Sequence, residues 1–211
     1  MTLIKAVIDF VLNIDKNLVM MAAQYGGWIY GILFAVIFSE TGLVVTPFLP
    51  GDSLLFAAGA LAAMGSFNIV YLWIILAVAA FLGDTVNYWI GHFIGPKAFS
   101  MNSGILKKEY LDKAQAFYDK HGGKAIVLAR FVPIVRTFAP FVAGVGKMHY
   151  GNFITYNLMG GLLWVTLFTM GGFFFGNIPW VKHNFEIVVV VIVLISVVPI
   201  VIEWIKSKRR V

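Results

Sequence analysis

The chain has 211 residues, of which 60% are hydrophobic and 12% are charged, and its mean hydropathy is +0.88. A soluble domain needs roughly a quarter of its residues charged to cover its surface, so the composition excludes that class and predicts a membrane protein. The formal net charge is +6, but the basic residues lie in loops and tails between apolar stretches, which argues for membrane orientation and against nucleic-acid binding.

The first segment, residues 1–17, mixes apolar and charged side chains with a helical period. We therefore expect an amphipathic helix that lies in the membrane interface. A cleaved signal peptide fits poorly, because Asp9 interrupts the apolar run and no small-residue cleavage site follows. Residues 18–205 then form a single predicted membrane domain, and residues 206–211 form a basic tail.

Four apolar segments are long enough to cross a bilayer as helices, because about 20 helical residues span a hydrocarbon core of about 30 Å. They are residues 18–39, 69–91, 153–176 and 185–205. The loop at about 92–124 and the tail both carry an excess of lysine and arginine. We expect both to be cytoplasmic, together with the two chain termini.

Two further apolar segments, at about 41–64 and 125–145, are interrupted by prolines and charges. The interrupting residues are Pro47, Pro50, Gly51 and Asp52 in the first and Arg130, Pro133, Arg136 and Pro140 in the second. Proline removes a backbone donor, and broken backbone at membrane depth must be satisfied by protein or by water in a cavity. We therefore predict two re-entrant hairpins, the first entering from the outer face and the second from the inner face.

The two halves of the chain resemble each other weakly at an offset of 85 residues. Residues 56–59 align with 141–144, and Gly91 aligns with Gly176. Each half is predicted to consist of a broken hairpin, a short glycine-containing turn and a span. The two turns are residues 65–68 and 150–153, and the two halves have opposite orientations in the membrane. Inverted repeats of this kind are typical of secondary transporters, whose substrate site lies between the repeats. The predicted fold is an all-α polytopic integral membrane protein with inverted repeats.

Five charged residues lie inside the apolar segments: Glu40, Asp52, Asp84, Arg130 and Arg136. A charge at a helix centre costs about 2.5–3.5 kcal/mol, so such residues persist where they pair, line water or carry function. Glu40 and Asp52 also fit the outer headgroup region, and Asp52 also fits a helix N-terminal cap. Residues expected to support the site without touching substrate are Asp84, Pro50, Gly51, Pro133 and Pro140.

Arg130 and Arg136 indicate a binding site more specifically than the carboxylates do. A continuous helix would set Arg130 and Arg136 about 120° apart, so the break at Pro133 is what lets them converge. Planar guanidinium groups suit phosphate or carboxylate, and a helix terminus adds backbone donors. In the alternative reading the arginines only neutralise the three carboxylates. The two readings are compatible if an anionic substrate competes with the carboxylates for the arginines and protons exchange as it does so.

No cofactor or metal site is expected. The chain has no cysteine, and its four histidines lie at segment ends or in loops without metal-ligand spacing. A Gly-rich phosphate loop and a nucleophile elbow are also absent from the sequence. The many Phe, Trp and Met side chains are those that lipid-facing and interfacial surfaces use.

These residues resemble the DedA family of membrane proteins, which share the VTT domain with eukaryotic lipid scramblases. The resemblance covers nearly the whole chain, and one motif around the arginines is its most specific part. The matching pieces are Glu40 with Pro47-Phe48-Leu49-Pro50-Gly51-Asp52, Gly83-Asp84 with Tyr88 and Gly91, and Arg130-Phe131-Val132-Pro133 through Arg136-Thr137-Phe138, Pro140 and Ala143-Gly144. His92 departs from the Arg or Lys of many members.

The resemblance implies a translocase of the bacterial cytoplasmic membrane that returns undecaprenyl phosphate from the outer to the inner leaflet. It implies that Arg130, Arg136 and Thr137 bind the phosphate and that Glu40 and Asp52 couple or gate protons. The expected partners are that lipid or another anionic lipid, protons, membrane lipids and, as one alternative, a second copy of the chain in a homodimer.

Several other functions stay open at this point. They are a proton-coupled exporter of small cations or drugs, a phospholipid scramblase and a scaffold protein. A membrane enzyme such as a lipid phosphatase would need a histidine nucleophile near the arginines, and the apolar segments offer none. We therefore expect a transporter and not an enzyme.

Overall fold

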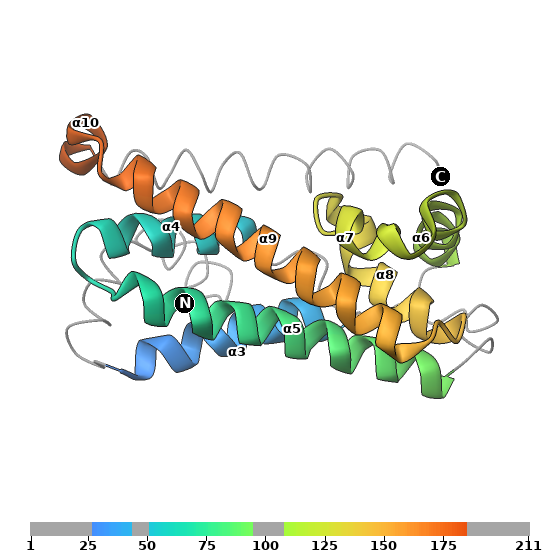
Figure 1. The fold of residues 1–211 in the computed structure, drawn as a ribbon. Helices are drawn as coiled ribbons and strands as arrows, with labels where there is room; N and C mark the ends of the chain where they lie inside the picture. Colours follow the sequence, from blue (N-terminus) through green and yellow to red (C-terminus); the bar gives the residue numbers. More distant parts are fainter. Residues whose placement is uncertain (1–26, 44–50, 95–107, 185–211) are drawn as a thin grey trace, which may run out of the picture. The chain divides into compact units, whose positions relative to one another are not determined.

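The computed structural model describes residues 27–43, 51–94 and 108–184 (Figure 1). The described residues are helical and contain no strand, in agreement with the all-α prediction. The elements are α3 (Trp28–Gly42), α4 (Gly51–Ala63), α5 (Ile69–Ile94), α6 (Lys108–His121), the 3-10 turn η2 (Gly122–Lys124), α7 (Ala125–Ala129), α8 (Pro133–Val145), α9 (Tyr150–Gly176) and α10 (Pro179–His183).

Several predicted segments lie outside the described residues. They are the interfacial helix 1–17, the first part of the span 18–39, the prolines Pro47 and Pro50, the span 185–205 and the tail 206–211. The other two predicted spans fall on α5 and α9, which have 26 and 27 residues. Among the described helices, these two are long and apolar enough to cross a membrane.

Helix α5 exposes large apolar side chains along its length. Large apolar side chains with more than a third of their surface exposed recur every three or four residues along it: Val70, Ile74, Val78, Leu82, Val86, Trp89 and Phe93. In water a stripe of this length would favour aggregation, whereas in lipid it lies in its preferred solvent. The same helix buries its polar residues Asp84 and Asn87. A soluble helix buries its apolar side chains and exposes its polar ones. The opposite pattern of α5 fits a membrane environment.

The chain forms two compact units, and each is described by itself. The first unit consists of residues 1–32, 50–73 and 168–211. Within it, α4 packs against the C-terminal part of α9 through glycines. A Cβ on Gly59 would strike the Thr169 carbonyl, and a Cβ on Gly172 would strike the Phe56 carbonyl. Small residues that let two backbones approach closely are typical of helix packing in membranes.

The second unit consists of residues 33–49 and 74–167. Here α8 packs against the C-terminal part of α5 in the same manner. A Cβ on Gly144 would strike the Tyr88 carbonyl, and a Cβ on Gly91 would strike the Phe141 carbonyl. Each broken segment therefore packs on the end of the long helix that belongs to the other half of the sequence.

The two packing arrangements correct the predicted alignment of the halves. Gly144 makes the contact that Gly59 makes in the first unit, at the predicted offset of 85 residues. Gly91, however, makes the contact of Gly172, at an offset of 81. The predicted match of Gly91 with Gly176 is therefore wrong by about one helical turn. It is also wrong as a span end, because α5 continues to Ile94.

The offset has already changed at the turns after α4 and α8, where matching residues lie 82 positions apart. Each turn is closed by a backbone hydrogen bond that joins residues five apart. The bonds run from Ser66 N to Leu61 O at 3.0 Å and from Met148 N to Ala143 O at 2.9 Å. The left-handed position is taken by Gly65 (φ 86°) in one turn and Lys147 (φ 52°) in the other. The predicted turn at 150–153 is therefore wrong, since α9 already begins at Tyr150.

A helix also lies inside the predicted basic loop 92–124. This helix, α6, belongs to the second unit and is amphipathic. Its side chains Phe117 and Tyr118 pack against the apolar cluster that contains much of α8, while Asp119 and Lys120 are exposed. The loop is therefore partly folded onto the unit that carries both arginines.

Candidate functional site

The helix break predicted at Pro133 is present. Val132 is extended (φ −116°, ψ 107°), and Pro133 starts α8. A residue before proline avoids the helical conformation, and proline fits the first turn of a helix because no donor is needed there. Arg130 follows the last residue of α7, and Arg136 lies in the first turns of α8. The two arginines therefore flank the break.

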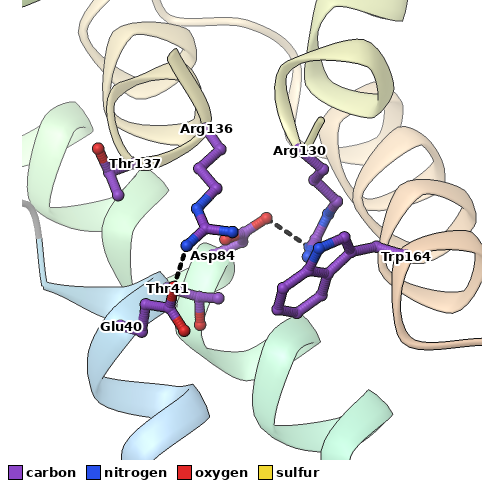
Figure 2. Close-up of a pocket in the computed structure, with 7 residues that line it drawn as sticks. All are labelled: Glu40, Thr41, Asp84, Arg130, Arg136, Thr137 and Trp164. Carbon is purple, nitrogen blue, oxygen red and sulfur yellow. Dashed lines mark hydrogen bonds and ion pairs between the residues drawn. The ribbon is translucent and has the colours of Figure 1, made fainter. Parts of the chain in front are cut away.

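Both guanidinium groups point into one pocket of the second unit (Figure 2). The enclosed cavity is small, about 10 Å³, and the empty space counted with the open mouth is about 270 Å³. The lining residues come from α3, α5, α8, α9 and the helix break: Glu40, Thr41, Asp84, Arg130, Arg136, Thr137 and Trp164. The pocket thus brings together five residues named from the sequence, and adds Thr41 and Trp164.

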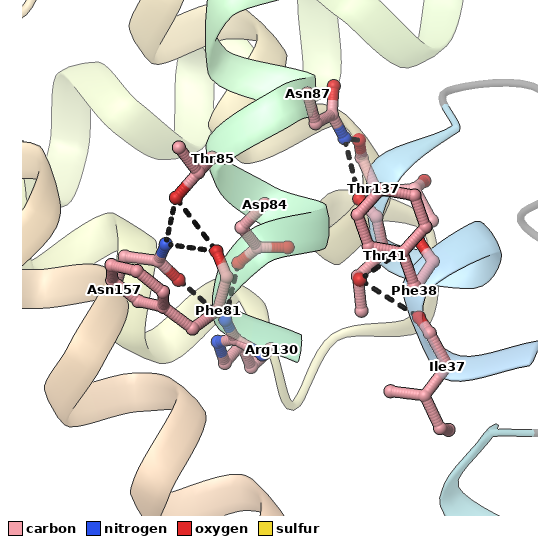
Figure 3. A network of polar contacts seen from close by, with 10 residues as sticks. All are labelled: Ile37, Phe38, Thr41, Phe81, Asp84, Thr85, Asn87, Arg130, Thr137 and Asn157. Atoms are coloured by element: carbon pink, nitrogen blue, oxygen red, sulfur yellow. Dashed lines mark hydrogen bonds and ion pairs between the residues drawn. The ribbon is translucent and has the colours of Figure 1, made fainter. Parts of the chain in front are cut away.

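Arg130 is held by two acceptors and is nearly fully buried. Its Nη2 donates to Asp84 Oδ2 at 2.5 Å and to Asn157 Oδ1 at 2.7 Å (Figure 3). The side chains of Arg130 and Asp84 are each 5% exposed. Asn157 Nδ2 in turn donates to the Phe81 carbonyl at 3.1 Å, which fixes the amide on α9 against α5. Asp84, expected as a supporting residue, thus lies at the pocket wall as the ion-pair partner of Arg130.

Arg136 forms the second ion pair. Its Nη2 contacts Glu40 Oε1, and the two side chains are 13% and 1% exposed. This pair joins α8 to the last turn of α3. Replacing one partner of such a buried pair leaves the other charge uncompensated, which costs about 3–5 kcal/mol.

Asn87 on α5 holds the backbones that carry this pair. Its Nδ2 donates to the Thr41 carbonyl at 3.0 Å and to the Thr137 carbonyl at 2.8 Å (Figure 3). These carbonyls belong to the residues that directly follow Glu40 and Arg136. Asn87 therefore fixes the distance between the two chain segments that supply the ion pair.

Trp164 lies against both arginines. The centroid of its ring is 5.8 Å from Arg130 Cζ and 5.7 Å from Arg136 Cζ, and the residue is 2% exposed. A guanidinium within about 6 Å of an indole face is attracted by the ring quadrupole. The expectation that tryptophans face lipid is therefore wrong for Trp164, because the fold turns this one inward.

The sequence reasoning did not single out Asn87, Asn157 or Trp164. A signal for two of them was available in the spacing along α9, where Asn157, Gly160, Gly161 and Trp164 recur at helical intervals and so share one face. A polar residue and two glycines on one face of an apolar span indicate an inward contact. Asn87 could have been found as a second polar residue in an apolar span, three residues after Asp84.

The remaining predicted residues are not among those that line the pocket. Asp52 is half-buried in the first turn of α4, which Gly51 begins, and both belong to the first unit. Pro140 lies inside α8 and cannot donate to the carbonyl of Arg136. In the described ranges, no three His, Asp or Glu side chains are grouped so as to hold a metal ion.

Comparison with known proteins gives the family. A model of the VTT domain matches residues 49–174. The chain is 56% identical to Protein DedA of Escherichia coli (strain K12) over 212 aligned positions, which cover 99% of this chain and 97% of that protein. The chain belongs to the DedA family of membrane proteins.

Other DedA-family relatives are more distant. Identity is 44% to Uncharacterized membrane protein ML0287 of Mycobacterium leprae (strain TN), covering 78% of this chain and 74% of that protein. It is 38% to Inner membrane protein YqjA of Escherichia coli (strain K12), covering 72% and 70%. These relatives support a bacterial membrane location for this DedA-family chain. No solved structure matches the chain.

Proposed function

We propose that this DedA-family protein moves a phosphorylated lipid, undecaprenyl phosphate, from the outer to the inner leaflet with proton coupling. The observation that carries the proposal is the convergence of Arg130 and Arg136, from the two sides of a helix break, in one buried pocket. Two guanidinium groups in such a pocket provide charge-assisted donors that match the oxygens of a phosphate. The hydroxyl of Thr137, which also lines the pocket, adds a neutral donor.

The charge balance of the pocket supports proton coupling. Both arginines are ion-paired within the pocket, Arg136 with Glu40 and Arg130 with Asp84. A phosphate that arrives at two neutralised arginines must take at least one of them from its carboxylate. Protonation of Glu40 removes the charge that holds Arg136 and lets the arginine turn to the phosphate. Asp52 remains a proposed proton-coupling residue on the family resemblance alone.

A lipid substrate suits the surroundings of the pocket better than a soluble anion. The long helices α5 and α9 expose apolar side chains along their lengths, so a polyprenyl tail can stay in contact with the membrane while the head group enters. We propose that α4 and α7–α8 are the membrane-inserted parts of two re-entrant hairpins in inverted repeats. Their matching glycine contacts with the ends of α9 and α5 support that arrangement.

Export of small cations is the weaker alternative. It requires carboxylates that are open to a cation, whereas Glu40 and Asp84 each face an arginine. A cation would need to displace a guanidinium from a buried carboxylate and would leave that guanidinium without its partner. The pocket geometry therefore favours an anion.

Transport in vesicles tests the proposal. The purified protein is reconstituted in liposomes, and the inward movement of undecaprenyl phosphate is compared with that of undecaprenol, which lacks the phosphate. We expect movement of the phosphate lipid alone, lost in Arg136→Ala and retained in Leu163→Ala, a control at an exposed apolar position of α9. Transport at the wild-type rate by Arg136→Ala would rule out the proposed role of this arginine.

A further inference from the structure

One face of α9 is built around Arg130. Asn157, Gly160, Gly161 and Trp164 follow one another at helical spacing, so they lie on one side of the helix. Asn157 accepts a hydrogen bond from Arg130, as described above. Trp164 supplies an aromatic face at the other end of the same stretch.

The two glycines between them let the arginine lie directly on the helix. A Cβ on Gly160 would be 3.2 Å from Arg130 Cδ, and a Cβ on Gly161 would be 3.3 Å from Arg130 Nη2. Both distances are shorter than most Cβ contacts, so an alanine at either position would require the Arg130 side chain to shift by a few tenths of an ångström. Arg130 is therefore fixed by packing, by an ion pair and by a hydrogen bond to an amide.

Arg136 contacts the same face at Trp164. The indole lies within 6 Å of both guanidinium groups, which carry like charges and would otherwise repel each other in a buried pocket. Because the ring is 2% exposed, water does not weaken its attraction for the cations as it does at a protein surface.

We infer that Trp164 is the positioning residue of the phosphate site. It keeps Arg136 beside the fixed Arg130 when the substrate takes Arg136 from Glu40. This inference rests on the proposed function. The ion pair between Arg136 and Glu40 is lost on substrate binding, but the contact with the indole does not depend on the carboxylate. The ring therefore stays in contact with both cations before and after the phosphate binds.

Binding of dodecyl phosphate to the purified full-length protein tests this role, with dodecanol as the uncharged control ligand. The variants are Trp164→Phe, Trp164→Leu and, as a matched control, Trp180→Leu, which changes a tryptophan that is 63% exposed. Trp164→Leu removes the aromatic face from two cations, so we expect affinity to fall about tenfold or more. Trp164→Phe keeps a weaker aromatic face and should lose only a few-fold, and Trp180→Leu should bind as the wild type does.

Tryptophan fluorescence provides a readout that a purely structural role would not change. Dodecyl phosphate should alter the emission of the wild type, because the charges around the Trp164 ring rearrange. That response should vanish in Trp164→Phe, which still binds the ligand, and persist in Trp180→Leu. The Trp164→Phe arm decides the matter even where Trp164→Leu is poorly folded.

The outcomes separate the inference from the function on which it rests. A wild type that binds dodecyl phosphate no better than dodecanol contradicts the proposed function and removes the inference with it. A wild type that binds the phosphate, together with a folded Trp164→Leu of equal affinity, overturns the inference alone. An emission response that survives in Trp164→Phe also overturns it.

Discussion

The guanidinium of Arg136 and the carboxylate of Glu40 form a buried ion pair that joins α8 to the end of α3. Glu40 is the more deeply buried partner, with 1% of its side chain exposed. Burial leaves a carboxylate in that position with little solvation to replace its partner when the arginine is removed. The stability of the pocket therefore depends on keeping its charges balanced, more than on either charge by itself.

The first prediction concerns this balance. Arg136→Gln should lower the free energy of unfolding by about 3–5 kcal/mol, because Glu40 is left buried and uncompensated. The double variant Glu40→Gln/Arg136→Gln should recover much of that loss, since two neutral amides can hydrogen-bond to each other. Unfolding of the three proteins in one detergent measures both effects. A double variant no more stable than Arg136→Gln would mean that the pair is not the source of the cost.

The second prediction concerns the amide that holds Arg130. Asn157→Leu removes an acceptor from Arg130 and a donor from the Phe81 carbonyl, and both groups are then buried without that bond. We expect a loss of about 1–3 kcal/mol in unfolding free energy. Asn152→Leu, at an exposed position on the same helix, is the matched control and should change stability little. Equal effects at the two positions would contradict the role assigned to Asn157.

The third prediction concerns the close packing of α8 on α5. Gly144→Ala places a methyl group against the Tyr88 carbonyl, so the helices must separate, and we expect a loss of about 1–3 kcal/mol. Gly31→Ala meets nothing within 4 Å and should be neutral or slightly stabilising. Thermal unfolding compares the two alanine variants with the wild type. A Gly144→Ala protein as stable as Gly31→Ala would show that the backbones do not approach closely there.

The fourth prediction concerns the turn between α8 and α9. Lys147 has a φ of 52°, a conformation that costs a residue with a side chain about 1–2 kcal/mol and glycine almost nothing. Lys147→Gly should therefore raise the unfolding free energy, by about 1 kcal/mol or less once the greater freedom of the unfolded chain is counted. The reverse change at the matching turn, Gly65→Ala, should be destabilising. A destabilised Lys147→Gly would contradict the turn geometry.

Much of the fold can be predicted from local patterns in the sequence. The spans at α5 and α9 are visible because a long apolar run has few structural alternatives in a chain of this composition. The break before Pro133 is visible because proline imposes it through its own backbone. The convergence of Arg130 and Arg136 was inferable from that break together with the cost of two charges in an apolar segment.

Other features depend on tertiary contacts that no local pattern reports. Trp164 has the same residue type as the lipid-facing tryptophans, and only the packing of α9 on Arg130 distinguishes it. The turn at 146–149 was missed because a lysine occupies the left-handed position, while the glycine at 151 lies in a helix. The helix α6 was not predicted, because the many charged residues of this segment indicated a loop. Phe117 and Tyr118 nevertheless give the helix an apolar face.

The central claim is that Arg130 and Arg136 together bind the phosphate of a lipid. Native mass spectrometry of the protein, extracted from bacterial membranes, tests this most directly, since it identifies the lipid that stays bound. We predict a retained polyprenyl phosphate in the wild type and in Leu163→Ala, and its loss in Arg130→Ala and Arg136→Ala. Retention of the same phosphate lipid by both folded arginine variants, or retention of uncharged lipid alone by the wild type, would contradict the claim.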